Sequence, residues 1–226
     1  MTTCELLDVS GNNPSDIDFA KVRAAGVVGV YVKLTEGVHY LDPHALRYEP
    51  LLKAAGLPFG GYHYLRIRSG TPQDAKEQAI EFCNALRASG ATLPAAVDVE
   101  LAENEAATHD EVHQAVTDFR AAFVEEMGYE PVIYTSHGEW TAWGISMTGD
   151  PSFATSDLWL ADYETTPHPP SPWTSCVLHQ YTGSGMCDGV PGKVDHSRFQ
   201  GDEAAFRVWA GLPSACSQTD PAPSAA

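Results

Sequence analysis

The chain has 226 residues, 43% of them hydrophobic, and carries a net charge of −17. This length suits a single α/β domain, and so acidic a surface argues against nucleic acid as a partner, because the phosphates would repel it. No run of about 18 apolar residues occurs, so we expect no transmembrane helix and no membrane partner.

The cysteine pattern argues against a metal site. There are five cysteines, an odd number, at Cys4, Cys83, Cys176, Cys187 and Cys216. No C-x-x-C pair and no Cys/His group with zinc spacing occurs, so we expect no metal and no cofactor. Cys176 and Cys187 flank a polar loop and could form a disulfide. We expect free thiols instead, because residues 1–5 show no secretory signal.

In the first half of the chain, short apolar runs that end at Gly, Pro or Asn predict strands, and longer amphipathic runs predict helices. The predicted strands are 6–10, 27–34, 57–65 and 93–100, and the predicted helices are 15–25, 44–55 and 71–89. The third helix is predicted to begin with Thr71 as N-cap and Pro72 at its first position. Gly60 and Gly61 indicate a close backbone approach or a bulge in the third strand.

The second half opens with a helix over 108–127, which Thr108 and Glu111 begin with a capping box. The predicted strands that follow are 131–135, 158–163, 176–181 and 194–195. A short helix is predicted through Trp140 and Trp143, and a closing helix over 202–209. Residues 167–172 hold four prolines and are predicted to form an irregular loop.

Strands that alternate with helices predict a parallel α/β architecture. Eight strands favour an irregular TIM-like (β/α) barrel with fewer than eight helices, because the last connections are too short and too rich in proline for full helices. A doubly wound open sheet is the alternative, weakened by the absence of a Gly-rich phosphate loop after the first strand. We predict a catalytic domain over 1–212 and a disordered Ser/Pro/Ala-rich tail, or the start of a linker, over 213–226.

Acidic and aromatic residues gather near the predicted ends of the strands, where such barrels carry their chemistry. Asp98 and Glu100 are two residues apart on one strand, so they point to the same face at about 6–7 Å, the scale at which two carboxyl groups flank a glycosidic bond. The candidate site residues are Asp8, Tyr62, Asp98, Glu100, Tyr134, Trp159, Tyr163, Gln180 and Asp195. Simpler interpretations remain open: a strand that ends in solvent for the two carboxylates, and core packing for Tyr62, Tyr134 and Trp159.

Eight short motifs in the same order resemble those of glycoside hydrolase family 25, the muramidases, over about residues 5–210. They are Leu7-Asp8-Val9-Ser10, the segment 30–37, Gly61-Tyr62-His63-Tyr64, Asp98-Val99-Glu100, the segments 132–135 and 158–163, Gln180-Tyr181 and Val194-Asp195. One departure is Gly11-Asn12-Asn13, where the family usually has an aromatic residue or His followed by Gln.

The resemblance implies an irregular β/α barrel that cleaves the β-1,4 bond between N-acetylmuramic acid and N-acetylglucosamine in peptidoglycan. It implies Glu100 as general acid, Asp98 as its partner, Asp8 and Asp195 as further acids of the groove, and Tyr62 beside the substrate. We expect Asp8 and Asp195 to meet beside the catalytic pair, because all four are predicted near the carboxyl ends of parallel strands.

The expected partner is the glycan strand of bacterial peptidoglycan, and the expected state is a monomer. Without a signal peptide, the family resemblance favours a phage endolysin that is made in the cytoplasm and acts on the cell wall after release. A bacterial autolysin is also compatible. Two other classes remain: a carbohydrate-binding barrel that has lost catalysis, and a peptidoglycan amidase, against which the lack of metal-ligand spacing argues.

Overall fold

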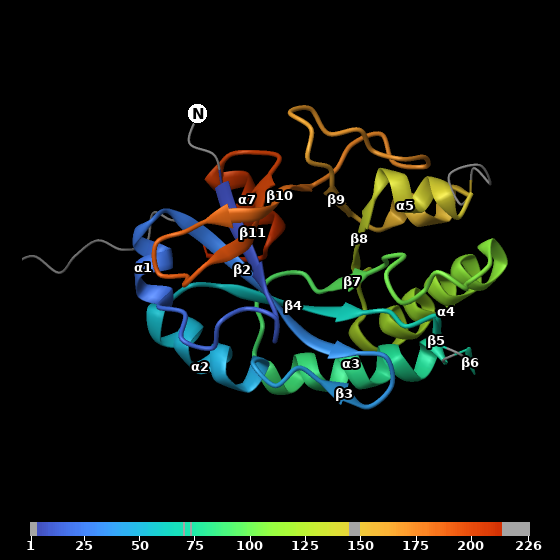
Figure 1. Cartoon of the computed structure of the whole chain (residues 1–226), viewed down its shortest axis with the longest axis horizontal. Helices are drawn as coiled ribbons and strands as arrows, with labels where there is room; N and C mark the ends of the chain where they lie inside the picture. The colour runs from blue at the N-terminus through green and yellow to red at the C-terminus, as the bar shows by residue number, and fades with distance from the viewer. Residues whose placement is uncertain (1–3, 70, 73, 145–149, 214–226) are drawn as a thin grey trace, which may run out of the picture.

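The computed structural model describes residues 4–69, 71–72, 74–144 and 150–213 (Figure 1). The predicted tail beyond Pro213, with Cys216, lies outside the described residues. The other four cysteines are free thiols. Within the described part of the chain, no helix is long and apolar enough to cross a membrane.

Eight strands form a closed barrel. They are β1 (Cys4–Val9), β2 (Val27–Glu36), β4 (Phe59–Tyr64), β7 (Ala96–Asp98), β8 (Val132–Ser136), β9 (Leu158–Ala161), β10 (Leu178–Met186) and β11 (Lys193–Phe199). Neighbours pair in this order, and β1 pairs with both β2 and β11, which closes the barrel. Short pieces lie outside it: β3 (Tyr40–Leu41) extends the sheet beside β2, and β5 (Arg68–Ser69) pairs with β6 (Thr71–Pro72).

Helices flank the strands on the outside (Figure 1). Among the described residues they are α1 (Phe19–Ala24), α2 (Ala45–Ala55), α3 (Ala75–Ser89), α4 (His109–Met127), α5 (His137–Ala142), α7 (Glu203–Trp209) and the 3-10 helix η1 (Pro151–Thr155). The capping box of Thr108 and Glu111 begins α4 as predicted. The irregular barrel with fewer than eight helices is therefore confirmed.

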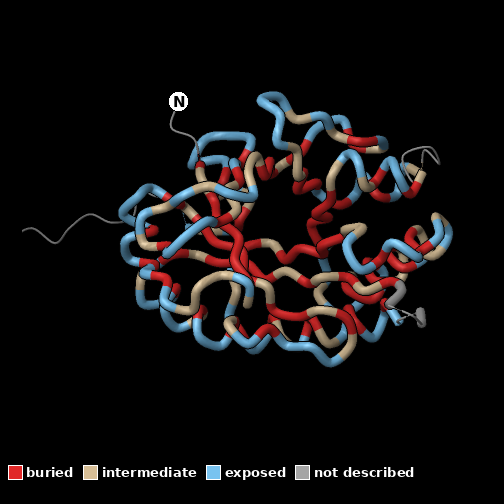
Figure 2. The backbone as a smooth tube through the Cα atoms, viewed as in Figure 1, coloured by how far each residue is buried: buried red, intermediate tan, exposed pale blue. Residues whose placement is uncertain are grey.

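Buried side chains fill both sides of the barrel wall. Figure 2 shows that buried residues follow the strands, whereas exposed residues lie on the outer faces of the helices. Inside the barrel the Tyr31 ring packs against Trp159, with ring centroids 4.6 Å apart. Gly60 makes this packing possible, because a Cβ atom at that position would lie 2.6 Å from the Tyr31 ring. The close approach that Gly60 indicates in the sequence is therefore confirmed.

One strand direction was predicted wrongly. Neighbouring barrel strands are parallel from β1 through β2, β4, β7, β8 and β9 to β10, but β11 is antiparallel to both β10 and β1. The link between β10 and β11 is only about six residues long, and a parallel connection needs a dozen or more. Asp195 therefore reaches the rim from the beginning of its strand rather than from the end.

The start of α3 was also predicted wrongly. Thr71 and Pro72 belong to the short strand β6, and the N-cap of α3 is Asp74. The Asp74 carboxylate accepts hydrogen bonds from the backbone N–H groups of Lys76 and Glu77, at 2.9 and 3.1 Å. Thr71 and Asp74 are each followed three residues later by an acidic residue, so both fit the pattern of a helix start. Asp74 caps the helix, because it stands directly before the apolar residues that recur at helical spacing.

Candidate functional site

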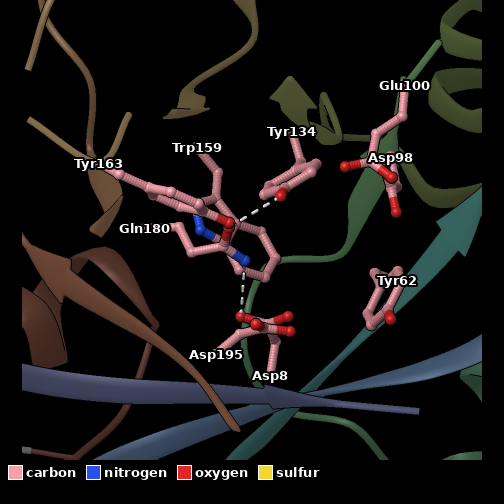
Figure 3. A pocket seen from close by; sticks show the side chains of 9 residues that line it. All are labelled: Asp8, Tyr62, Asp98, Glu100, Tyr134, Trp159, Tyr163, Gln180 and Asp195. Carbon is pink, nitrogen blue, oxygen red and sulfur yellow. Dashed lines mark hydrogen bonds between the residues drawn. The ribbon is translucent and has the colours of Figure 1, made fainter. Parts of the chain in front are cut away.

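All nine candidate side chains line one cavity of about 190 Å³ at the rim of the barrel. Figure 3 shows Asp98 and Glu100 together on one side, Asp8 and Asp195 together on another, and the Tyr62 ring in the region between them. A larger cavity of about 490 Å³ adjoins this one and shares Glu100, Tyr134 and Tyr163 with it. The barrel thus offers an open acidic groove lined with aromatic rings. The segment Gly11-Asn12-Asn13 does not line either cavity.

Asp8 and Asp195 face each other across β1 and β11, where they are direct partners in the strand register. Their carboxyl groups share a hydrogen bond. Gln180 Nε2 donates a further hydrogen bond to Asp8 Oδ2 at 3.1 Å. Like charges directly opposite each other on neighbouring strands repel, so the contact requires a proton between the two carboxyls.

Asp8 is the member of this pair that keeps the proton. Burial raises the pKa of Asp8 well above its ordinary value, and the nearby Asp195 charge raises it further. Burial also raises the pKa of Asp195, but the hydrogen bond with Asp8 opposes that rise. When the pair holds one proton, this proton therefore stays on Asp8, which donates it to Asp195.

Asp8→Asn is expected to reduce the loss of stability as the pH rises from about 5 to about 8. A carboxyl whose pKa is raised in the folded state contributes stability at low pH, and this contribution is lost as the pH rises towards the raised pKa. Asparagine has no such proton to lose and can still accept the hydrogen bond from Gln180. Urea titrations at the two pH values give the free energies of unfolding that test this.

Glu105→Gln is the control. Backbone N–H groups of Glu105 and Glu103 lower the pKa of the exposed Glu105 carboxyl. This carboxyl does not keep its proton to a higher pH in the folded state, so its replacement should leave the pH dependence of stability unchanged. Equal pH dependence in Asp8→Asn and the wild type would contradict proton sharing.

Asp98 and Glu100 lie at the end of β7. The strand predicted over 93–100 is observed only as Ala96–Asp98, so Asp98 is its last residue and Glu100 follows in the loop. Among the described residues, no hydrogen-bond donor reaches Asp98 Oδ1, although this atom is buried. A buried carboxylate oxygen without a donor is costly and calls for an explanation, such as a bound ligand.

Both carboxyls keep their protons to a higher pH than free carboxyls do. Burial raises the pKa of Asp98 well above its ordinary value, and the Glu100 charge adds to this while Lys33 opposes it. Burial also raises the pKa of Glu100 to about 7, and the charge of Glu139 adds to the rise. The nearby Tyr134 hydroxyl and the charge of Lys33 act in the opposite direction on Glu100.

Aromatic side chains and an amide form the opposite wall. The Tyr134 and Trp159 rings pack edge to face at 4.9 Å, and Trp159 Nε1 donates to Ser197 Oγ at 2.9 Å. Both rings are almost fully buried, so they belong to the barrel core and line the cavity at the same time. The hydroxyls of Tyr134 and Tyr163 both donate to Gln180 Oε1, at 2.9 and 3.3 Å.

Sequence reasoning missed two charged residues that act on this site, Lys33 and Glu139. Lys33 lies in the segment 30–37 that carries part of the resemblance, and its charge favours the ionised forms of Asp98 and Glu100. Glu139 stands three residues after Ser136, a helix-start pattern that was available in the sequence.

One group of possible metal ligands occurs among the described residues, and it lies outside the cavity. His39, Glu77 and Glu81 place their ligand atoms within 4.8 Å of one another at the surface. Exposed acidic groups of this kind are common without an ion. The histidines predicted to lie in strands, His63 and His179, are buried and hydrogen-bonded, His63 to Thr35 and Gln78, and His179 to the backbone of Asp162.

Comparison with known proteins gives a consistent result. Lysozyme M1 of Streptomyces globisporus is 26% identical over 193 residues, and the autolytic lysozyme of Clostridium acetobutylicum is 30% identical over 183 residues. These alignments cover 83% and 81% of this chain but 65% and 52% of the relatives, so the chain spans between half and two thirds of their length. The crystal structure of the bacterial lysozyme from Streptomyces coelicolor has a TM-score of 0.81 at 25% identity, covering 93% of this chain and 98% of that chain.

The family follows from a match that covers most of the chain. Residues 7–190 match the protein-family model described as "Glycosyl hydrolases family 25". The matched segment begins one residue before Asp8 and includes eight of the nine residues that line the cavity, and Asp195 lies just beyond it. The chain therefore belongs to glycosyl hydrolases family 25.

Proposed function

We propose that the chain is a muramidase, which hydrolyses the β-1,4 bond between N-acetylmuramic acid and N-acetylglucosamine in peptidoglycan. The observation that carries this proposal is Glu100, an acid whose pKa is raised to about 7, beside the buried Asp98 in a groove with aromatic walls. Cleavage of a glycosidic bond needs a carboxylic acid that is still protonated at the working pH. The lysozymes among the relatives support the same activity.

Glu100 is the proposed general acid. With a pKa of about 7, a large fraction of Glu100 is protonated near neutral pH, and the group can donate this proton to the leaving oxygen as the glycosidic bond breaks. The carboxylate that remains then accepts a proton from the water that completes hydrolysis. One side chain thus serves both steps, as microscopic reversibility requires.

Asp98 is proposed to hold the 2-acetamido group of the substrate. Its buried Oδ1 has no donor from the described residues, so it can accept the acetamido N–H. A hydrogen bond donated to a carboxylate favours the charged form, and substrate binding therefore favours a charged Asp98 beside a protonated Glu100. The charged Asp98 then stabilises the positive charge that develops when the acetamido oxygen attacks the anomeric carbon.

The other residues of the cavity are proposed to bind the sugars. Gln180 connects the hydroxyls of Tyr134 and Tyr163 to Asp8, so these polar groups form one continuous network. Such a network holds its members in fixed positions before the substrate arrives. Trp159 and Tyr62 supply flat apolar surfaces beside it, and Asp195 supplies a carboxylate that can accept hydrogen bonds from sugar hydroxyls.

The proposal extends to the setting in which the protein acts. Residues 1–212 would form the catalytic domain, and the protein would act as a monomer on the glycan strands of the bacterial cell wall. The names of the relatives, a lysozyme and an autolytic lysozyme, support a wall substrate. The net charge of −17 supports the absence of a nucleic-acid partner.

Mass spectrometry of the soluble products released from purified peptidoglycan tests the proposed function. New reducing ends on N-acetylmuramic acid are expected, because hydrolysis then occurs at the bond that the proposal names. New amino termini would overturn the proposal in favour of an amidase or peptidase. Binding to the wall without any released product would identify a carbohydrate-binding barrel instead.

A further inference from the structure

The peptide unit between Glu100 and Leu101 is held at both ends by side chains. Its carbonyl oxygen accepts a hydrogen bond from Asn104 Nδ2 at 2.9 Å. Its N–H donates to Glu139 Oε1 at 3.0 Å. Because a peptide unit is planar and rigid, fixing both its oxygen and its nitrogen fixes the rotation of the backbone at Glu100. The direction in which the Glu100 side chain leaves the backbone is fixed with it.

Asn104 connects this peptide to the neighbouring strand ends. Its side chain is fully buried, and its Nδ2 also donates to the backbone oxygen of Leu65 at 2.9 Å. Its Oδ1 accepts the backbone N–H of Ile67 at 2.8 Å. The carbonyl side of the Glu100 peptide is therefore tied to the chain that follows β4.

Glu139 reaches the other side of the peptide from the first turn of α5. In an ordinary capping box, the third-position glutamate accepts the backbone N–H of the N-cap residue, as Glu111 does for Thr108 at 2.8 Å in α4. In α5, Ser136 caps the helix by accepting the N–H of Glu139 at 3.1 Å. The Glu139 carboxylate, however, accepts the Ser136 hydroxyl and the N–H of Leu101. Its carboxylate thus joins α5 to the loop that carries Glu100.

We propose that Glu139 is a positioning residue for Glu100: it orients the acid through the Glu100–Leu101 peptide and places a negative charge beside it, while Asn104 holds the opposite end of the same peptide. This inference rests on the proposed function of Glu100 as general acid. Glu139 also lines the larger cavity together with Glu100, so its charge faces the same space as the acid.

The charge of Glu139 acts among several others around Glu100. The groups that face Glu100 from the surrounding elements are Asp8 of β1, Lys33 of β2, Tyr64 of β4, Asp98 of β7, Tyr134 of β8, Glu139 of α5, Tyr163 of the loop after β9 and Asp195 of β11. After burial, Glu139 contributes most to the rise that brings the pKa of Glu100 to about 7. Removing that charge should therefore release the proton of Glu100 at a lower pH.

Two substitutions separate the hydrogen bond of Glu139 from its charge. In Glu139→Gln, the amide oxygen can still accept the N–H of Leu101, but the charge is gone. The kcat at acidic pH should stay close to the wild-type value, and the alkaline fall in kcat should move to lower pH. In Glu139→Ala both effects are lost, and kcat should fall about 10- to 100-fold at every pH while KM changes little, because the acid is misplaced.

Glu111→Gln and Glu111→Ala are the matched controls, because they alter the same helix-cap position in α4 away from the cavity. Both should keep the wild-type pH profile and kcat. Thermal unfolding of all four variants measures how much stability each substitution at the helix cap removes. An unshifted alkaline limb in Glu139→Gln, or wild-type kcat in Glu139→Ala, would overturn the proposal.

A second readout does not depend on catalysis. The side-chain carboxyl ¹³C resonance of Glu100, assigned by its absence in Glu100→Gln, is titrated by NMR in the wild type and in Glu139→Gln. The midpoint should be lower in the variant, and an equal midpoint would overturn the electrostatic part of the proposal. If the wild type released no reducing ends from peptidoglycan, the proposed function would fail, and the titration would still decide whether Glu139 acts on Glu100.

Discussion

Glu100→Gln is expected to lower the release of reducing ends from peptidoglycan by about 10²- to 10⁴-fold, the range that a general acid contributes. The amide has nearly the same shape as the carboxyl but cannot give a proton to the leaving oxygen. The expected loss should appear in kcat, with KM close to the wild-type value. Steady-state kinetics on soluble peptidoglycan fragments at about pH 6, where the wild-type acid is protonated, measure the effect.

Glu105→Gln is the control for this experiment. Glu105 lies on the same loop, five residues after Glu100, but it is exposed and does not line the cavity. The control should keep wild-type activity, and thermal unfolding should show that both variants fold. Wild-type activity in Glu100→Gln would remove this residue from the mechanism.

Asp98→Asn is expected to lower kcat by about 10²- to 10³-fold, the usual effect of removing one group that stabilises transition-state charge. In the proposed mechanism the acetamido group gains positive charge as its oxygen attacks the anomeric carbon. A charged Asp98 compensates that charge, and a neutral amide cannot. A variant that folds and retains most of its kcat would show that Asp98 carries no charge in the transition state.

The stereochemistry of the first product distinguishes the role of Asp98 from its main alternative. Attack by the acetamido group gives net retention, so NMR should first detect the β anomer from the β-linked substrate. A thiazoline analogue of the cyclised sugar should then inhibit, though weakly. An α anomer as the first product would mean inversion, with Asp98 acting as the base that activates a water.

Much of the architecture could be predicted from local sequence patterns. The glycines that follow predicted helices, Gly26, Gly56 and Gly90, and the capping box at Thr108 are local signals. The structure has helix ends at the three glycines and a helix start at Thr108. The closed barrel followed from the number of strands and their alternation with helices. Eight of the nine residues that line the cavity could be chosen because one barrel rim collects the ends of the parallel strands. Asp195 reaches the same rim from the beginning of the antiparallel β11.

The remaining features depend on non-local geometry. The direction of β11 depends on the length of the link at residues 187–192, which is too short for a parallel connection. The expectation of a fully parallel barrel left this short link without weight. The carboxylate of Glu139 reaches a loop 38 residues earlier in the chain, a contact that no pattern around Ser136 reveals. The raised pKa of Asp8 likewise depends on its burial and on its register with Asp195, which only the folded barrel establishes.

The reversed last strand also affects when activity can arise during synthesis. β11 (Lys193–Phe199) pairs with β1 (Cys4–Val9), and no other two neighbouring strands of the barrel are so far apart in sequence. Until β11 has been synthesised, β1 remains an open sheet edge and Asp8 lacks its carboxyl partner. Contacts so distant in sequence carry a high entropic cost and are expected to form late. A nascent chain that lacks β11 should therefore show none of the proposed activity, because the first and last strands complete the groove together.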